Sequence, residues 1–176
     1  MHFLNDGKHA LVFPPRCGTR WIAGLLHDNG LLDTRGPHHR FEWVEKPNIE
    51  TFMFVRNPFT RERSLHRWLA ETNKIDLSEL SFEQYVASDL FDQEGSWYTR
   101  YGKLNNHVTH IHLEELNDFL VNTIGIDAPE YDNLYHLVDD NRQDQEIFNN
   151  QFIVEKILDK YKEDLKHLNF DLTSYL

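Results

Sequence analysis

Short runs of apolar residues alternate along the chain with longer segments whose apolar residues recur at the spacing of a helix face. The runs predict strands over residues 10–13 and 51–55, and a further strand is predicted over 108–113. The segments after the first two runs predict helices from about 19 to 26 and from 58 to about 72. Strands that alternate with helices pair in parallel through right-handed crossovers. The pattern therefore predicts an α/β fold of three layers, with a central, mainly parallel sheet flanked by helices.

Further helices follow from their end signals. Ser81 and Gln84 have the spacing of a capping box, which predicts a short helix over about 81–90. A helix over about 114–123 follows the last predicted strand, and an apolar stripe predicts a final helix over about 151–167. Neither an internal repeat nor a low-complexity linker divides the chain, so we expect a single domain over 1–176.

Composition and charge support one core and limit the partners. Hydrophobic residues make up 40% of the chain and aromatic residues 13%, which is sufficient for one substantial core. The formal net charge of −11 argues against a nucleic-acid or anionic-membrane partner and also disfavours a heavily sulfated polyanion as a partner. Positive charge is nevertheless concentrated locally, in Arg56, Arg61, Arg63 and Arg67, which indicates an anion site in that segment.

Other features are typical of a soluble, cytoplasmic protein. No apolar run approaches the roughly 20 residues of a membrane span, and residues 1–7 lack the charged and apolar regions of a signal peptide. The single cysteine, Cys17, excludes an internal disulfide and fits a reducing compartment.

Residues 10–22, Ala-Leu-Val-Phe-Pro-Pro-Arg-Cys-Gly-Thr-Arg-Trp-Ile, predict a strand that passes through a tight loop into a helix. The first amides of a helix lack intrahelical partners and lie at the positive end of its dipole, so they can hold a phosphate or sulfate. Gly18 permits a close backbone approach, Thr19 offers a hydroxyl and Arg16 adds positive charge. The loop departs from a nucleotide-binding P-loop, which needs a second glycine upstream and a Lys directly after Gly18.

A second strand, turn and helix are predicted over residues 52–69. Arg56 stands at the carboxyl end of the predicted strand, where open α/β sheets bind ligands. Arg61 and Ser64 are three residues apart and share one helix face. Two guanidinium groups and a hydroxyl that converge on one point suit a phosphate monoester.

The alternative interpretation of this basic helix is a solvated face whose arginines pair with Glu62 and Glu71. For Arg63 and Arg67 the two interpretations are equally favoured. For Arg56 a bound anion is favoured, because an Arg directly after an apolar strand is costly unless it is paired, and no acidic residue stands beside it in the sequence.

Both segments resemble motifs of the sulfotransferases that use 3′-phosphoadenosine-5′-phosphosulfate (PAPS). The first is similar to the 5′-phosphosulfate loop, Pro-Lys-x-Gly-Thr-x-Trp, with Arg16 where that family usually has Lys. The second is similar, almost residue for residue, to the 3′-phosphate signature V-R-x-P-x-x-R-x-x-S, especially in the carbohydrate sulfotransferase branch. The segment from Val154 through Tyr161 and Asp164 to Asp171 is similar to the ending V-x-x-x-Y-x-x-D-x-x-x-F-x-Y of that branch.

The resemblance implies a P-loop-like core, PAPS as donor, 3′,5′-diphosphoadenosine (PAP) as product and no metal. It implies an enzyme that transfers a sulfuryl group to a hydroxyl of a carbohydrate or small-molecule acceptor. The nucleotide-binding residues that it implies are Arg16, Cys17, Gly18, Thr19, Arg20, Trp21, Arg56, Arg61 and Ser64.

Sulfuryl transfer also needs a base with a pKa near neutrality, because the acceptor hydroxyl loses a proton as it attacks. His38 and His39 lie in the connector between the two motifs, where the family often has its catalytic His, and Glu42 is the alternative because some members use a carboxylate. Arg16 would bridge the transferring group and the leaving oxygen. Its contribution would be electrostatic, since an Arg does not give up its proton.

Two further features, a group of histidines and the single cysteine, indicate a function less specifically. His107, His110 and His112 resemble a metal-binding cluster, with the last two on one strand face. No nearby cysteine completes the set, and we expect no metal. Cys17 beside a helix N-terminus could form a thiolate, although a small residue that fills space in the loop is the preferred interpretation.

Two other functions remain open from the sequence. A P-loop kinase or NTPase is disfavoured, because the second strand ends in Arg56-Asn57 and not in an acidic magnesium ligand. A protein that binds the nucleotide but has lost turnover is the stronger alternative, because Arg16 replaces the usual Lys.

Overall fold

A computed structural model describes residues 2–33, 48–72, 76, 80–93, 108–127, 148–170 and 172 of the chain. These residues belong to two compact units, each formed by two stretches of sequence. The first unit comprises Met1–Arg56 and Leu104–Asp132, and the second comprises Asn57–Lys103 and Asn133–Leu176. The boundary between them follows directly on the predicted second strand, inside the predicted phosphate-binding motif. That the whole chain acts as a single domain remains a prediction.

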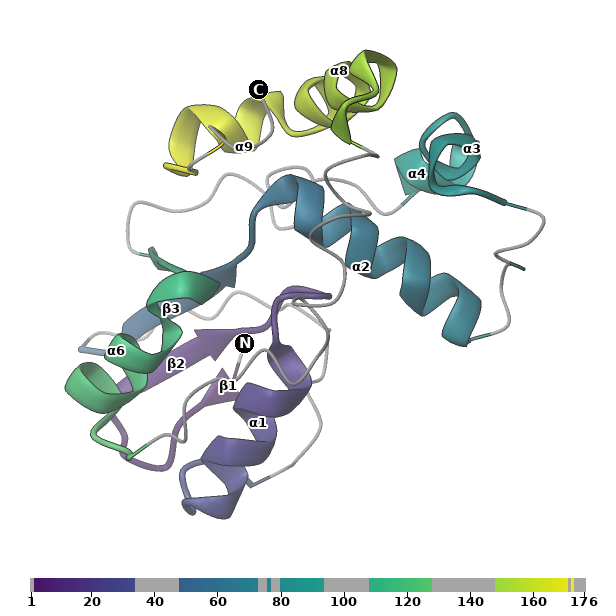
Figure 1. The fold of residues 1–176 in the computed structure, drawn as a ribbon. Coiled ribbons are helices and arrows are strands. Elements are labelled where there is room, and N and C mark those ends of the chain that lie inside the picture. The colour runs from purple at the N-terminus through teal and green to yellow at the C-terminus, as the bar shows by residue number, and fades with distance from the viewer. Residues whose placement is uncertain are drawn as a thin grey trace. The chain divides into compact units, whose positions relative to one another are not determined.

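The first unit contains a four-stranded sheet in the order β1-β2-β3-β4 (Figure 1). Its strands are β1 (His2–Phe3), β2 (His9–Val12), β3 (Glu50–Val55) and β4 (Val108–His112). β2, β3 and β4 pair in parallel, as predicted, and β1 is antiparallel to β2. β1 was not predicted, because two residues are too few to show a strand periodicity. The expected α/β fold with a mainly parallel sheet and flanking helices is thus confirmed.

The strand register places aromatic side chains together on one face of this sheet. Leu11 is paired with Phe52, and Phe54 with Ile111. Phe13 stacks on Phe54, with ring centroids 5.9 Å apart. Side chains at alternate positions of parallel strands share a face, so these rings form one apolar layer.

A helix covers that aromatic face. After β4 the chain continues as η1 (Leu113–Glu115), α6 (Leu116–Phe119) and η2 (Leu120–Ile124). The Phe119 ring lies edge-on to Phe52 at 4.8 Å and to Phe54 at 5.7 Å. One helix was predicted over this stretch, whereas the structure has a 3-10 turn, an α-helical turn and a π-helical turn in succession. The π turn ends at Gly125, where a left-handed backbone (φ 78°) stops the helix.

α1 (Thr19–Asp28) follows β2 and buries one apolar stripe, formed by Ile22, Ala23 and Leu26. It ends at Asp28, two residues beyond the predicted end. Gly30 has φ 72°, and its N–H donates to the His27 carbonyl at 2.9 Å. The helix is therefore fixed at both ends, by the β2–α1 loop before it and by this glycine turn after it.

The second unit is helical where the structure describes it, with one long predicted helix and several short ones. Asn57 caps the long helix, α2, by accepting a hydrogen bond from the Phe59 N–H at 2.9 Å. The predicted capping box is present, since Ser81 and Gln84 each bond the other's backbone N–H. The helices are α2 (Pro58–Glu71), α3 (Phe82–Val86), α4 (Asp89–Gln93), α8 (Gln151–Lys160) and α9 (Lys162–His167).

Two helices predicted as continuous are each divided in this unit. The helix over 81–90 is split into α3 and α4, and the helix over 151–167 is interrupted at Tyr161, which ends α8 and begins α9. The Tyr161 side chain is completely buried and hydrogen-bonded. We attribute the interruption of the helix at this residue to these tertiary contacts.

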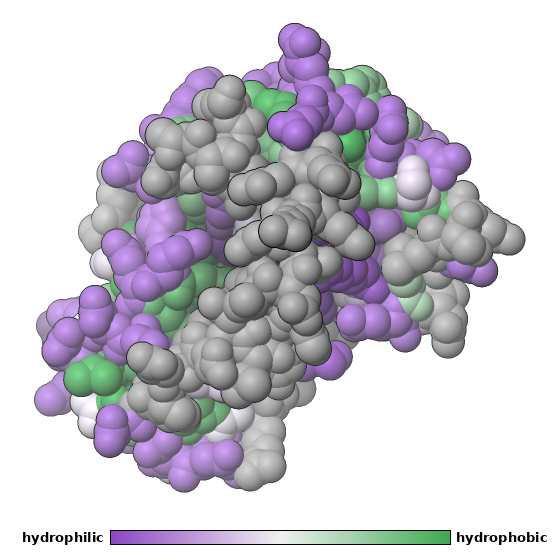
Figure 2. Space-filling model, viewed as in Figure 1, coloured by the Kyte–Doolittle hydropathy of each residue, from purple (hydrophilic) through white to green (hydrophobic). Residues whose placement is uncertain are grey.

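The visible surface is mostly polar where the structure describes it (Figure 2). Among the described residues, the large hydrophobic side chains with substantial exposure are Val121, at 48%, and Phe152, at 41%. They belong to different units, and single exposed apolar residues are ordinary on protein surfaces. No helix in the described ranges is long and apolar enough to cross a membrane.

Candidate functional site

The loop between β2 and α1 has an unusual backbone. Two of its residues, Arg16 and Gly18, both have φ 67°, in the left-handed region. Glycine adopts this conformation readily, but a residue with a side chain pays about 1–2 kcal/mol for it. Such conformations concentrate at ligand-binding sites, where the surrounding structure holds them. The loop predicted to bind an anion therefore has two residues in a left-handed backbone conformation, which is typical of ligand-binding loops.

The N-terminus of α1 has the electrostatic character that the sequence predicted. Gly18 is its N-cap residue, so no side chain of the cap accepts a hydrogen bond from the first-turn amides. The first turn of this fully described helix also contains no acidic residue. The positive end of the dipole is therefore not neutralised by its own cap, which favours an anion there.

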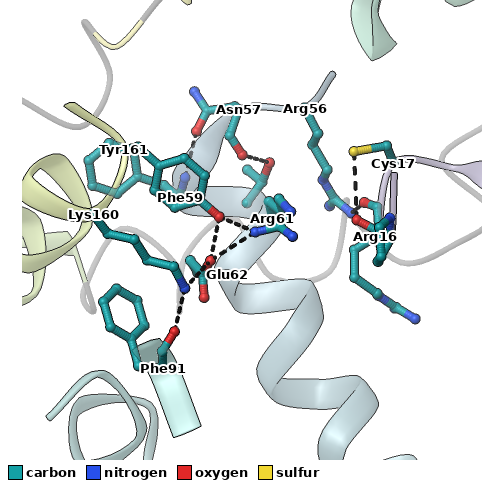
Figure 3. A network of polar contacts seen from close by, with 12 residues as sticks. Arg16, Cys17, Arg56, Asn57, Phe59, Arg61, Glu62, Phe91, Lys160 and Tyr161 are labelled. Carbon is teal, nitrogen blue, oxygen red and sulfur yellow. Dashed lines mark hydrogen bonds and ion pairs between the residues drawn. The ribbon is translucent and has the colours of Figure 1, made fainter. Parts of the chain in front are cut away.

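Arg56 lies beside this loop within the first unit. It follows β3, whose neighbouring strand β2 leads into the loop. The Arg56 side chain is partly buried, and its Nη1 donates a hydrogen bond to the backbone carbonyl of Arg16 at 3.2 Å (Figure 3). The sequence predicted that Arg56 needs a partner but did not identify a main-chain carbonyl as one.

The other predicted residues of the loop differ in exposure. Cys17 is completely buried, and its Sγ lies 3.7 Å from the Pro15 carbonyl oxygen. Thr19 is buried, Trp21 is partly buried and Arg20 is exposed. The first unit thus places Arg56 against the loop that contains Arg16, Cys17 and Gly18.

Arg61 has a different environment, in the interior of the second unit. Its side chain is completely buried, and its Nη1 lies 3.2 Å from Glu62 Oε1. The same Nη1 donates a hydrogen bond to the Tyr161 hydroxyl. The solvated face considered for Arg61 and Glu62 is therefore wrong, since both are 0% exposed. A contact between Arg61 and a phosphate remains a prediction, and Ser64 on the same helix is partly buried.

Glu62 is the centre of a buried polar cluster, which we call the Glu62 cluster: Arg61, Glu62, Tyr85, Lys160 and Tyr161. Figure 3 shows Glu62 with Arg61, Lys160 and Tyr161. Glu62 accepts hydrogen bonds from the Tyr161 hydroxyl and, at 2.9 Å, from the Tyr85 hydroxyl. Lys160 Nζ lies 2.9 Å from Glu62 Oε1 and donates to the Phe91 carbonyl at 2.5 Å. The cluster joins α2 to α3, α4 and the α8–α9 junction.

Burial sets the acid–base properties of this cluster. Desolvation lowers the pKa of Lys160 below 10.5, although the Glu62 carboxylate opposes the shift. Desolvation also raises the pKa of Tyr161 well above 10.0. Tyr161 is therefore a neutral hydrogen-bond donor at neutral pH, which suits its place next to a carboxylate.

Sequence reasoning missed Glu62, Tyr85 and Lys160 as members of a buried cluster. A charged residue on a helix normally points to water, and nothing local distinguishes Glu62 from such a residue. The available signal was the resemblance of the Tyr161 segment to a family motif, which marked one partner of the cluster.

Several predicted site residues lie outside the described part of the chain. His38, His39 and Glu42 fall within residues 34–47, and His107 within residues 94–107. His110 and His112 are on β4, in register with Met53 and Val55, and so share a sheet face as predicted. Within the described ranges, no group of three or more His, Cys, Asp or Glu side chains is arranged to hold a metal ion.

Comparisons with known proteins give no relative for this chain. No protein-family model, no curated protein and no solved structure matches it. A functional proposal therefore depends on the residues of the chain and on the geometry of the β2–α1 loop with Arg56.

Proposed function

We propose that this protein is a sulfotransferase that moves the sulfuryl group of PAPS to a hydroxyl of a carbohydrate or small-molecule acceptor. The observation that carries the proposal is the hydrogen bond between Arg56 and the Arg16 carbonyl. It joins an arginine of one family-like motif to the loop of the other. We extend the proposal to the fold, as a P-loop-like core around the parallel strands.

In this proposal the β2–α1 loop binds the 5′-phosphosulfate end of the donor. The first-turn amides of α1 and the Arg16 guanidinium stabilise the charge that develops on the leaving phosphate oxygen. The acceptor oxygen attacks sulfur in line as the bond between sulfur and that oxygen breaks, which leaves PAP. Because Arg16 keeps its proton, it acts electrostatically.

The 3′-phosphate of the donor would be recognised by the motif that contains Arg56. Arg56 offers a planar guanidinium that suits a phosphate, and Ser64 offers a hydroxyl. Arg61 was assigned the same role from the sequence. Its interactions inside the second unit favour a smaller direct contribution, with Glu62 as its ionic partner.

The acceptor proton would pass to His38, His39 or Glu42. A neutral imidazole or a carboxylate can accept it as the oxygen attacks sulfur. The three residues precede β3, the strand that ends at the proposed site.

The alternative with a specific observation in its favour is a nucleotide-binding protein without turnover. It is supported by Arg16, which replaces the family's usual Lys and adopts a left-handed backbone. A kinase or NTPase has weaker support, because β3 is followed by Arg56-Asn57 and not by an acidic residue.

The test of the proposed function is donor turnover. The protein is incubated with PAPS and a panel of sugar and phenol acceptors, and both PAP and the sulfated product are quantified by mass spectrometry. We expect both to form in equal amounts, without added magnesium. PAP binding without product would favour the binding protein, and magnesium-dependent ATP hydrolysis would favour the NTPase.

A further inference from the structure

The left-handed conformation of Arg16 needs an external cause. A residue with a side chain adopts it only where neighbouring contacts hold it there. The hydrogen bond from Arg56 to the Arg16 carbonyl is such a contact, and it joins residues 40 positions apart in the sequence. It acts on the peptide group that follows the left-handed residue and leads into Cys17 and Gly18.

The support for this bond is rigid. Arg56 follows β3, where Phe54 and Val55 are both 0% exposed. β3 pairs with β2 on one side and with β4 on the other. A guanidinium fixed to a central strand can therefore define the position of a loop carbonyl, and its delocalised charge strengthens the hydrogen bond.

We infer that Arg56 is a positioning residue of the β2–α1 loop. By binding the Arg16 carbonyl, it keeps the loop in the shape that presents the first amides of α1 to an anion. This role is additional to the contact with the 3′-phosphate that the proposed function gives it. Loss of Arg56 would then weaken the binding of the 3′-phosphate, which it would contact directly. It would also weaken the binding of the 5′-phosphosulfate, which the loop would hold.

Cys17 allows a test that needs no ligand. It is the only cysteine of the chain, it is 0% exposed and it directly follows Arg16. Its rate of reaction with 5,5′-dithiobis(2-nitrobenzoate) reports how often the loop opens. Without the Arg56 bond we expect this rate to rise about tenfold, the change that corresponds to losing one charge-assisted hydrogen bond.

Matched variants separate this effect from general ones. Arg56→Ala removes the bond, while Arg56→Lys keeps a charge and one donor and is expected to show a smaller increase. Lys8→Ala removes an exposed positive charge elsewhere in the first unit, and Leu26→Val destabilises α1 without touching the loop. An increase in Arg56→Ala beyond that in Leu26→Val supports the inference. Equal rates in the wild type and both Arg56 variants overturn it.

A second arm rests on the proposed function and uses adenosine 5′-phosphosulfate, which lacks the 3′-phosphate. If Arg56 only contacts the 3′-phosphate, Arg56→Ala weakens PAP binding and leaves the affinity for this analogue unchanged. If Arg56 also positions the loop, its affinity for the analogue falls about tenfold as well. Wild-type protein that binds neither nucleotide contradicts the proposed function, while the thiol rates still decide the role of Arg56.

Discussion

At the scale of single residues, the second unit depends on one carboxylate. Glu62 is fully buried and is contacted by two hydroxyls, a guanidinium and an ammonium group. Buried charges are tolerated only when they are paired and hydrogen-bonded. Removing one partner from the cluster would leave a buried polar group unpaired, so we expect it to destabilise this unit.

We expect Tyr161→Phe to lower the free energy of unfolding by about 1–3 kcal/mol, because it removes a donor to buried Glu62. Glu62→Gln is expected to cost more, about 3–5 kcal/mol, because it leaves Arg61 and Lys160 without their common carboxylate. Urea denaturation measures both. Lys162→Ala is the matched control, since it removes a pair with Asp159 that is exposed on both sides. Losses no larger than in this control would contradict the account.

A second residue-scale prediction concerns His66. Its Nε2 donates to the Leu80 carbonyl at 3.0 Å, and among the described residues its buried Nδ1 has no hydrogen-bond partner. Desolvation lowers the pKa of His66 below 6.5, and the charges of Arg63 and Arg67 lower it further, against the effect of the Leu80 bond. The unfolded chain therefore binds this proton more readily than the folded chain, and stability falls as the pH drops below about 6.5.

The measurement is the free energy of unfolding between about pH 5 and pH 7. The His66→Gln variant keeps a donor for the Leu80 carbonyl and has no proton to gain in this range. We expect its stability to vary less with pH than that of the wild type. The same slope in both proteins would show that His66 does not carry the effect.

Some residues of interest could be predicted from the sequence, whereas the buried Glu62 cluster could not. Arg56, Arg16 and Gly18 could be proposed as site residues because each stands at a strand end or just before a helix in the sequence. The burial of Glu62 could not be predicted from the neighbouring sequence, because its partners Tyr85 and Tyr161 are 23 and 99 residues away. Such a cluster is defined by tertiary packing, which a single sequence does not contain.

At the scale of elements, the proposed anion site is formed by β2, the loop that follows it and the N-terminus of α1. The periodicities were sufficient to predict these elements, β3 and α2, because each has several apolar positions on one face. β4 was predicted as well, although only its Ile111 is buried. The periodicities were insufficient for β1 and for the break at Tyr161. β1 is too short to show a periodic pattern. The break at Tyr161 depends on contacts of its side chain with Arg61 and Glu62 of α2.

The backbone of the loop gives an element-scale prediction. Glycine adopts the left-handed conformation of Arg16 at little cost, whereas alanine does not. We expect Arg16→Gly to be more stable than Arg16→Ala by about 1 kcal/mol. Both variants lose the same guanidinium and should lose nucleotide affinity to a similar degree. Thermal unfolding and PAP titration measure the two effects, and equal stability of the variants would contradict the left-handed assignment.

At the scale of the whole molecule, the acidic chain holds its proposed anion site in a small basic region. The net charge is −11, yet Arg16 and Arg56 meet in the first unit, and the boundary to the second unit lies between Arg56 and Asn57. The boundary therefore falls within the segment predicted to bind a phosphate. The apolar pattern of the sequence gave no indication of a boundary at this point.

The catalytic proposal involves the whole site, including residues outside the described part of the chain. If His38 or His39 is the base, replacing that residue by Ala should lower kcat about 10²–10⁴-fold and leave nucleotide affinity nearly unchanged, while the other variant stays active. The rate should rise with pH through an apparent pKa of about 6–7, because only neutral imidazole accepts a proton. A pH–rate profile of the two variants and of Glu42→Gln measures this. Loss confined to Glu42→Gln would assign the role to the carboxylate.

The central claim is that the protein recognises a 3′-phosphorylated nucleotide. Isothermal titration calorimetry with PAP and with AMP tests it most directly, because the two ligands differ only in the 3′-phosphate. We predict that PAP binds about 100-fold more tightly than AMP, as expected for two charge-assisted contacts to that group. We also predict that this preference falls about tenfold in Arg56→Ala, which loses one of these contacts. Equal affinities for PAP and AMP in the wild type would contradict the account.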